Sequence, residues 1–372
     1  MENKNIYDNF IYDWWKNLDK VILFLFLSLI ILGVFFSLVS TSLIASSKLG
    51  TNNYYFFARH IIYVFLGLIL IIFFSAIPEK DIYKVGVILF IIFFLSLILV
   101  PIFGVELKGS KRWLNFPILP RFQPIEFLKP FLILFLSLVI GSRFTSNNYF
   151  KFFLSTLIVS PIILFLILQP DIGQTLLISS VWLCLIFVSG INLYLFNFLI
   201  FSSLSILGYL VFYLPKFSYI KYRIAAFLDI TSKGNYQSEK ATEAIIDGGF
   251  FGKGIGEGTL KTRVPEAHTD YVISVISEEF GVFLILLILL IFLLLIFRVF
   301  KKIPSEKNNI NKLVLIGSIL LIIFQVLIHI GVNIRFLPTT GMTLPFLSYG
   351  GSSILSSSIL AGLVLNFTKR KI

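Results

Sequence analysis

The sequence predicts an all-α polytopic membrane protein with about ten transmembrane helices. Of its 372 residues, 57% are hydrophobic, and the mean hydropathy is +0.94. Charged residues make up only 13% of the chain, whereas they make up about a quarter of typical soluble domains. Apolar runs of about 20 residues, the length that crosses a bilayer core, recur along most of the chain.

The positions of these runs define the predicted spans. The fourth span is short, and very tight turns at Gln169-Pro170-Asp171 and Ser189-Gly190 follow the fifth and sixth spans. An even number of spans places both termini on one side of the membrane. The predicted spans are 21–45, 60–77, 84–104, 126–141, 152–169, 171–189, 191–214, 271–300, 311–334 and 347–366.

A long polar segment, 215–269, separates the seventh and eighth predicted spans. No repeat of fixed period and no linker-like change in composition divides the chain, so we expect one membrane domain over 1–372. The 215–269 segment is then a large loop within that domain. Loops of this length are usually functional or disordered, and the motifs in this one favour function.

Lysine and arginine set the predicted orientation. The 215–269 segment is too long to determine topology. In the other segments, lysine and arginine are roughly twice as numerous on the side of the termini as on the opposite side. Lys301-Lys302 and Lys369-Arg370-Lys371 are the strongest cytoplasmic markers. We therefore expect a multi-pass protein of the cytoplasmic (inner) membrane with both termini in the cytoplasm. The 105–125 and 215–269 loops would face the periplasm.

The net charge of +12 does not indicate a nucleic-acid partner, because the basic residues stand between apolar runs instead of on one soluble face. Cys184 is the only cysteine, so the chain can form neither an internal disulfide nor a cysteine metal site.

Asp270 stands at the start of the eighth predicted span, with Ser274, Ser277 and Glu278 on the same helical face. Such a polar stripe should face a wet cavity or other helices, because carboxylates facing lipid are costly. A carboxylate at this depth can act as a general base. It can equally sit in the first helical turn with Thr269 as the cap, and the residues alone leave both readings open.

Glu126 and Lys129 are spaced to pair on one face of the fourth span, which Pro124 can begin. Pro130 lacks an N–H and leaves the Glu126 carbonyl without its helical donor. A structural ion pair and a functional site are equally compatible with this pattern, since ionisable residues within membrane spans are rare unless they are needed.

Two further charges stand at predicted helix ends. Asp171 lies where a helix dipole favours a carboxylate, and capping is its favoured role. Arg112 can hold an anionic phosphate or a lipid headgroup, or can simply anchor the chain at the interface.

Other motifs are less specific. The glycine-rich stretch at 252–258 lacks the preceding apolar strand of a dinucleotide site. His268 is the single histidine of the 215–269 loop, so a multi-histidine metal site has no support. The small and polar residues of 344–353, which include Ser348, favour close helix packing or a groove for a lipid headgroup.

Several segments together resemble the SEDS family of membrane proteins, and the FtsW type found in alphaproteobacteria more than RodA. They fall in order along almost the whole chain, which makes chance agreement implausible. The segments are KGSKRWLNF, RFQPIEFLK, LQPDIGQT, the run from YQSEK to SEEFG, and LPTTGMTLPFLSYGGSS.

The resemblance implies a peptidoglycan glycosyltransferase that polymerises lipid II during septal cell-wall synthesis. It makes Asp270 the catalytic residue and places Glu126 and Lys129 in the substrate cavity. Further motif residues expected to bind substrate are Arg112, Asp171, Glu266, His268 and Ser348. Three positions depart from the family pattern. Ile125 stands where the family usually has Ser, Arg335 where it has a small residue, and Thr340 where it has Lys. We hypothesise that Arg335 supplies the cation missing at 340 and contacts substrate.

The implied partners are lipid II, membrane lipid, a class B penicillin-binding protein of FtsI type and other division proteins. A divalent cation, magnesium or manganese, can assist the leaving pyrophosphate, and no organic cofactor is expected. A lipid II flippase and a RodA-like role in cell elongation are the alternatives. We rank the flippase lower because the acids cluster toward the outer ends of helices, whereas transporters bind substrate near the bilayer midplane.

Overall fold

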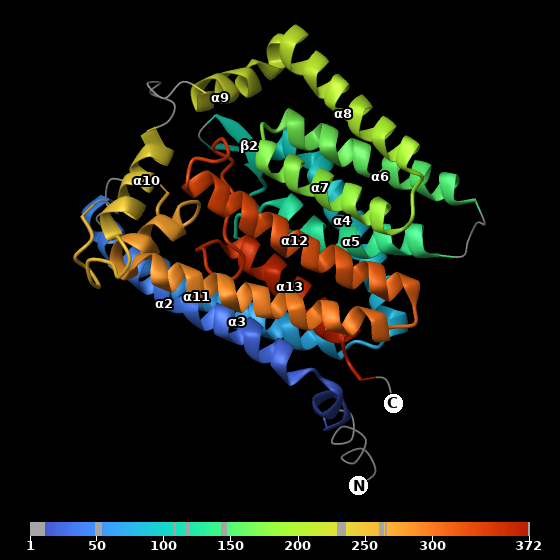
Figure 1. Ribbon diagram of the computed structural model, residues 1–372, viewed down its shortest axis with the longest axis horizontal. Coiled ribbons are helices and arrows are strands. Elements are labelled where there is room, and N and C mark those ends of the chain that lie inside the picture. The colour runs from blue at the N-terminus through green and yellow to red at the C-terminus, as the bar shows by residue number, and fades with distance from the viewer. Residues whose placement is uncertain are drawn as a thin grey trace.

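The protein is described here by a computed structural model, which covers residues 12–48, 54–107, 109–116, 120–142, 147–228, 236–259, 264 and 266–370 (Figure 1). It is almost entirely helical, as predicted. The long helices are α2 (Lys20–Lys48), α3 (Tyr55–Ala76), α4 (Glu79–Phe103), α5 (Pro124–Gly141), α6 (Asn148–Leu168), α7 (Ile172–Val188), α8 (Leu193–Tyr213), α11 (Val272–Lys302), α12 (Asn309–Asn333) and α13 (Gly351–Phe367).

Each predicted span corresponds to one of these helices. Within the described residues, eight are long and apolar enough to cross a membrane, and α7 and α13 are shorter apolar helices. α3 and α4 begin five residues before their predicted spans, at Tyr55 and Glu79, and α13 begins only at Gly351, four residues after the predicted start at 347. The preceding residues form a turn in which the N–H groups of Leu347 and Ser348 donate to the Leu344 carbonyl.

Helix starts follow local chemistry. Asn147, Asn192 and Asn308 precede α6, α8 and α12, and each side chain accepts a hydrogen bond from an N–H of the first turn. α5 begins at Pro124, whose missing N–H costs nothing at that position.

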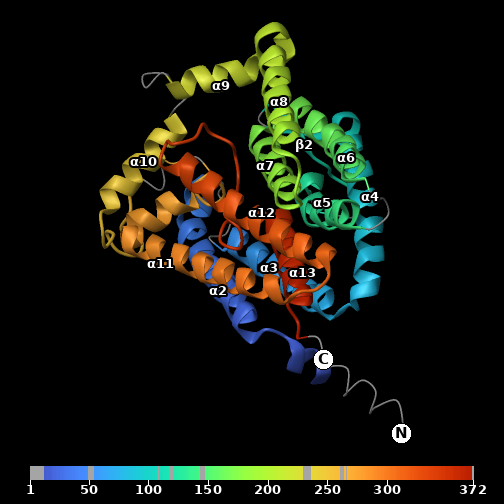
Figure 2. The same cartoon turned by 45° about the vertical axis from the view of Figure 1, so that its right-hand side comes forward.

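The centre of the molecule is formed by α5, α12 and α13 (Figures 1 and 2). α12 packs against α5 and α7, and α13 packs against α3 and α5. Within the candidate spans, 72% of α5 and 67% of α12 are buried in the protein, against 6% of α8. α5, which carries Glu126 and Lys129, is therefore covered by protein, and α8 lies at the periphery.

The helices run alternately up and down, so their connections gather at two ends. One end, called the outer end below, carries the antiparallel pair β1 (Val105–Leu107) and β2 (Ser110–Trp113). It also carries the 3₁₀ turn η1 (Pro215–Phe217), α9 (Ser218–Leu228) and α10 (Tyr236–Gly248), which lie within the 215–269 segment. At the opposite, inner end, η4 (Ile303–Ser305) follows α11, and the Arg370 N–H donates to the Asn17 carbonyl. The two ends of the described chain therefore meet.

α11 is interrupted at Gly281, whose φ of 80° and ψ of 171° lie outside helical values. Residues before this break are buried on all sides, whereas the helix after it has an exposed apolar face. The sequence did not predict this break, because an isolated glycine in an apolar run is usually accommodated within a helix.

Candidate active site

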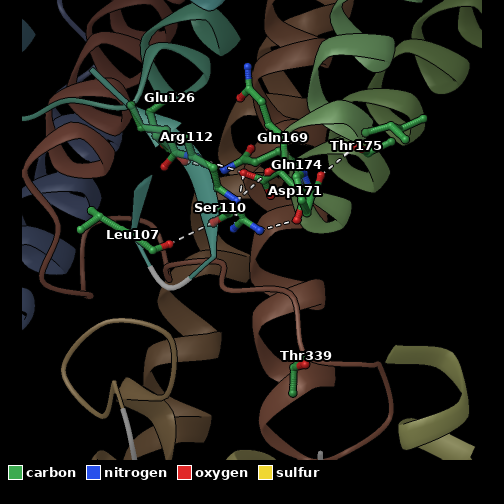
Figure 3. A network of polar contacts seen from close by, with 12 residues as sticks. Leu107, Ser110, Arg112, Glu126, Gln169, Asp171, Gln174, Thr175 and Thr339 are labelled. Carbon is green, nitrogen blue, oxygen red and sulfur yellow. Dashed lines mark hydrogen bonds and ion pairs between the residues drawn. The ribbon is translucent and has the colours of Figure 1, made fainter. Parts of the chain in front are cut away.

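All the predicted site residues lie at or near the outer end of the molecule. They form two groups. One is a network of side chains on β2, α5 and the turn between α6 and α7 (Figure 3). The other is the turn at 266–271 that precedes α11, together with the 334–350 connection.

Asp171 is the hub of the first group. Its Oδ1 accepts a hydrogen bond of 3.3 Å from the Gln174 N–H, which caps α7 as predicted. Its Oδ2 accepts from Gln123 Nε2 at 3.1 Å and lies 3.8 Å from Nη1 of Arg112. Arg112 also donates to the carbonyls of Gln169, at 3.1 Å, and Pro170 (Figure 3). Arg112 thus ties the strand pair to the α6–α7 turn.

Gln174 connects this hub to Glu126 and Lys129. Its Nε2 donates to Oε1 of Glu126 at 2.6 Å, and the other carboxylate oxygen lies 2.9 Å from Lys129 Nζ. The predicted pair therefore forms, and both side chains are buried, at 5% and 1% exposure. Lys129 Nζ is within ion-pair distance of the Glu126 carboxylate but is not well aligned for a hydrogen bond to it. Among the described residues, the buried Nζ has no other acceptor.

The Glu126 main chain confirms the expected effect of Pro130. The Glu126 carbonyl, left without its helical donor, accepts a 2.6 Å hydrogen bond from Ser356 Oγ of α13. On the same side, Ser352 Oγ accepts from the Gln123 N–H at 3.1 Å. The serines of α13 therefore hold the start of α5, which is close packing through polar contacts.

Asp270 lies in a turn built on Glu266, whose φ of 56° is left-handed. The Glu266 carbonyl accepts from the N–H groups of Thr269, Asp270 and Tyr271. Thr269 Oγ1 turns back to Glu266, 3.2 Å from both its carbonyl and its Oε2. The capping hypothesis for Thr269 is therefore wrong, because α11 begins at Val272 with Tyr271 at its N-cap position.

The polar stripe below Asp270 faces protein. Ser274 and Ser277 are fully buried and donate to the carbonyls of Tyr271, at 2.6 Å, and Ile245 of α10, at 3.4 Å. Glu278 is also buried and lies against Gly258 in the loop after α10. The outer part of α11 therefore does not face lipid, as predicted. The stripe is covered by α10 and its loop instead of lining an open surface with Asp270.

The 339–343 segment lies between the two groups. Thr340 is buried against Gly173, next to Gln174, since a Cβ added to Gly173 would come within 2.8 Å of the Thr340 Cβ. A Cβ added to Gly341 would lie 3.5 Å from Oδ2 of the half-buried Asp270. Asp270 and the Asp171–Gln174 start of α7 are therefore on either side of one short stretch of chain.

The remaining predicted residues have defined structural surroundings. The His268 ring lies 5.5 Å from the Phe56 ring and 5.6 Å from the Tyr349 ring. Ser348 is buried and its Oγ accepts from the Leu344 N–H at 2.8 Å, so it stabilises the turn before α13. Arg335 directly follows the C-cap of α12 with φ of 59°, a position that favours glycine.

Comparison with known proteins places this arrangement in a family. The FtsW, RodA and SpoVE family, described as cell cycle proteins, matches residues 19–371. The chain belongs to this family. The predicted family resemblance is therefore confirmed.

Named relatives and solved structures agree with the family match. A probable peptidoglycan glycosyltransferase FtsW of Coxiella burnetii is 34% identical over 359 residues, covering 93% of this chain and 95% of the relative. One of Caulobacter vibrioides is 30% identical over 359 residues, covering 96% and 91%. It supports the predicted alphaproteobacterial type.

Two solved structures share the fold. A chain of a peptidoglycan synthase complex, determined to describe how polymerization and crosslinking are coordinated, has a TM-score of 0.76 and 26% identity, covering 94% of this chain and 97% of that one. The Thermus thermophilus rod shape determining protein RodA has a TM-score of 0.69 and 25% identity, covering 95% and 97%. Over 94–95% of its length the chain therefore has the architecture of these family structures.

Three polar residues of this FtsW, RodA and SpoVE fold were missed by sequence reasoning. Gln123 and Gln174 join the charged side chains, although only their neighbours were singled out. Arg223 of α9 donates to the Thr339 carbonyl at 3.2 Å. Burial, and then the nearby Arg112 cation, lower the pKa of Arg223, so two guanidinium groups stand close enough to repel each other. An anion between them would relieve that repulsion.

The donor set of the site does not fit a resident divalent cation. Among the residues that the structure describes, no group of three or more His, Cys, Asp and Glu side chains is placed to hold a metal. Glu126 and Asp171 are each beside a cation already. A site of this kind favours anionic groups of a substrate over a bare metal ion.

Proposed function

We propose that this chain is a peptidoglycan glycosyltransferase that polymerises lipid II into glycan strands during septal cell-wall synthesis. The observation that carries the proposal is the placement of Asp270 across the 339–343 segment from the network that contains Arg112, Lys129 and Arg223. A carboxylate on one side of this segment and cations on the other suit a reaction in which a hydroxyl loses a proton while a pyrophosphate departs. The names and coverage of the FtsW relatives support the same reading.

In the proposed reaction, Asp270 accepts the proton of the acceptor sugar's 4-hydroxyl. The oxygen of that hydroxyl forms a bond to the anomeric carbon of the lipid-linked donor. The bond from that carbon to the pyrophosphate breaks, and undecaprenyl pyrophosphate leaves with the electron pair. Because this is a single displacement, an α-linked donor gives a β-linked product.

The positive residues stabilise the charge that develops on the leaving group. Lys129 Nζ is buried and poorly aligned with Glu126, so it can turn toward an anion. Arg112 and Arg223 are held by main-chain carbonyls at the outer end. Such preorganised cations cost no rearrangement when charge appears.

We further propose that magnesium or manganese enters only with the substrate's phosphates, since Mg²⁺ is usually bound by one or two carboxylates together with substrate oxygens. Calorimetry with either ion and the substrate-free protein should then detect no specific binding. Saturable binding to the substrate-free protein would contradict this.

The multi-pass membrane architecture sets the proposed topology. The inner end carries Lys301, Lys302, Lys369 and Arg370, which is typical of a cytoplasmic face. We place both termini there and the active site in the periplasm. A class B penicillin-binding protein of FtsI type is the proposed partner, because a structural neighbour of this chain belongs to a synthase complex that also crosslinks.

The experiment that tests the function uses purified protein in detergent with labelled lipid II, where flipping across a bilayer has no meaning. Wild type should produce glycan strands resolved on a gel. Asp270→Asn should lower the rate of glycan synthesis about 10²–10⁴-fold, which is the usual contribution of a general base. The control Asp81→Asn makes the same change at the inner end, where Asp81 is exposed, and should keep full activity.

Two results would overturn the proposal. Glycan synthesis by Asp270→Asn at the wild-type rate would remove the proposed base. Wild-type protein that binds lipid II but forms no strands, with or without its partner synthase, would favour the flippase.

A further inference from the structure

The break in α11 is repaired by the loop that follows α10. At Gly281 the helix leaves carbonyls and N–H groups without their usual partners. The Lys253 and Gly254 N–H groups donate to the carbonyls of Glu278 and Glu279, at 2.9 and 3.0 Å. In return, the N–H groups of Val282 and Phe283 donate to the carbonyls of Gly249 and Phe250, at 3.0 and 3.2 Å. Four main-chain hydrogen bonds thus join the loop to both sides of the break.

The contact between this loop and α11 leaves no room for a side chain at position 281. Gly281 has a left-handed φ, and a Cβ added there would overlap the Phe250 carbonyl oxygen. The outer part of α11, which leads back to Asp270, is therefore fixed by the loop after α10.

The last turn of α10 and the loop after it present large apolar side chains outward. We name Ile246, Phe250, Phe251 and Ile255 the outer patch. All four are more than half exposed, and Phe251 is 79% exposed. An exposed apolar cluster on a segment outside the spans indicates a contact surface.

The outer patch continues the lipid-facing side of α11. The Phe250 ring lies 5.9 Å from the Phe283 ring, which begins the exposed face of α11 beyond the break. The exposed apolar residues of this face are Phe283, Leu286, Leu287, Leu290, Leu293, Leu294, Phe297 and Phe300. The patch therefore extends a surface that a bilayer must already cover.

Charges around the patch are arranged as at a membrane interface. Asp247 and Lys253, which flank Phe250 and Phe251 in sequence, form an ion pair with each other. Farther back on α10, Lys240 and Glu243 pair at 2.5 Å. Segments that lie in the headgroup region present charged residues on one side and Phe, Trp or Leu on the other, with the apolar side buried at the boundary of the acyl chains.

We infer that the outer patch is seated in the outer leaflet of the bilayer, with lipid acyl chains as its occupant. The loop after α10 is then held from two sides, by lipid at the patch and by main-chain hydrogen bonds at Gly281. This inference concerns how the chain meets the membrane and does not depend on the proposed function.

Spin-label accessibility tests the inference. In a Cys184→Ser background, single variants Phe251→Cys and Ile255→Cys carry the label, and the protein is placed in phosphatidylcholine nanodiscs without any partner. Labels in the leaflet should collide more with oxygen than with a water-soluble nickel chelate, as a label at Leu290→Cys on the exposed face of α11 should. The matched control Glu243→Cys, on α10, should show the opposite preference.

The outcomes are distinct. Oxygen preference at both patch positions supports the inference. Nickel preference at both, equal to the Glu243→Cys label, overturns it and leaves water or a second protein as the occupant. Because Phe251 and Ile255 are exposed, the substitutions should not disturb folding, and an unchanged helical circular dichroism spectrum checks this.

Discussion

The two acid-bearing regions of the outer end are built in opposite ways. Glu126 sits on a helix and is buried, and its carboxylate is held by the side chains of Lys129 and Gln174. Asp270 is half-buried in a turn that is held mainly by main-chain groups, those of Glu266 above all. The first region depends on charge balance for its stability. The second depends on backbone geometry for its position.

The largest effect on stability should come from unbalancing the Glu126 region. Lys129→Met leaves a buried carboxylate without its cation and should lower the free energy of unfolding by about 3–5 kcal/mol, the usual cost of breaking a buried pair. A titration with sodium dodecyl sulfate in mixed micelles measures this.

The double variant Glu126→Gln with Lys129→Met is the control, because it removes both charges and should recover most of the loss. Equal losses in the single and double variants would mean that charge balance does not stabilise this region.

A smaller effect should come from Asn333, which ties Asp270 to the end of α12. Its Nδ2 donates to the Asp270 carbonyl at 3.2 Å and to the His329 carbonyl at 2.8 Å. Asn333→Ala should lower stability by about 1–3 kcal/mol, because buried carbonyls lose their donor. It should also lower kcat about tenfold with little change in KM, because a displaced base affects the transition state more than binding.

Asn366→Ala is the matched control at the inner end, where Asn366 Nδ2 donates to the carbonyls of Phe74, Ser75 and Ile77. It should lower stability similarly but leave kcat intact. Equal effects of the two variants on kcat would make Asn333 a structural residue only.

Replacing Arg335 should change stability by a still smaller amount and in the opposite direction. Its φ of 59° disfavours a side chain, so Arg335→Gly should stabilise the protein by roughly 0.5–1 kcal/mol. Gly190→Ala is the inverse control, since Gly190 has φ of 88° and open space around it, and it should destabilise by roughly 1 kcal/mol.

The same variant tests the hypothesis that Arg335 replaces the cation missing at 340. Under that hypothesis, Arg335→Gly should weaken lipid II binding although the protein is more stable. Unchanged affinity and activity would remove Arg335 from the site.

The smallest effect is the pH dependence of stability that Asp19 confers at the inner end. Unlike Glu126 and Asp270, Asp19 is paired with two cations, Arg298 and Lys302, at 3.0 Å each. Burial raises the pKa of Asp19, but hydrogen bonds to Lys302, the Ile22 N–H and Arg298 together lower it below its usual 3.8. The stabilisation is therefore complete above that value and is lost as pH falls through the lower, folded-state pKa.

Thermal unfolding between pH 3 and 7 should show this loss in wild type but not in Asp19→Asn. The same pH dependence in both proteins would show that Asp19 does not contribute.

The sequence predicted what depends on local pattern. Hydropathy located the helices, and helical spacing paired Glu126 with Lys129 and placed Asp171 as a cap. What it missed depends on segments distant in the chain. Gln174 reaches Glu126 across 48 positions, and Arg223 reaches the 339–343 segment from α9, so no local spacing could reveal either contact. The prediction that Thr269 caps α11 was wrong because the Thr269 hydroxyl donates instead to the carbonyl of Glu266, three residues earlier.

The repaired break in α11 has a consequence for how this chain can vary. The four bonds across Gly281 use only main-chain atoms, so the side chains of Phe250, Phe251 and Lys253 can be exchanged without loss of the repair. Gly252 cannot be exchanged, because a Cβ added there would overlap the Glu279 carbonyl. The number of residues between Gly248 and Gly281 cannot change near either end, because one insertion would shift all four pairs out of register. Deletions and insertions should therefore be rejected at 249–254.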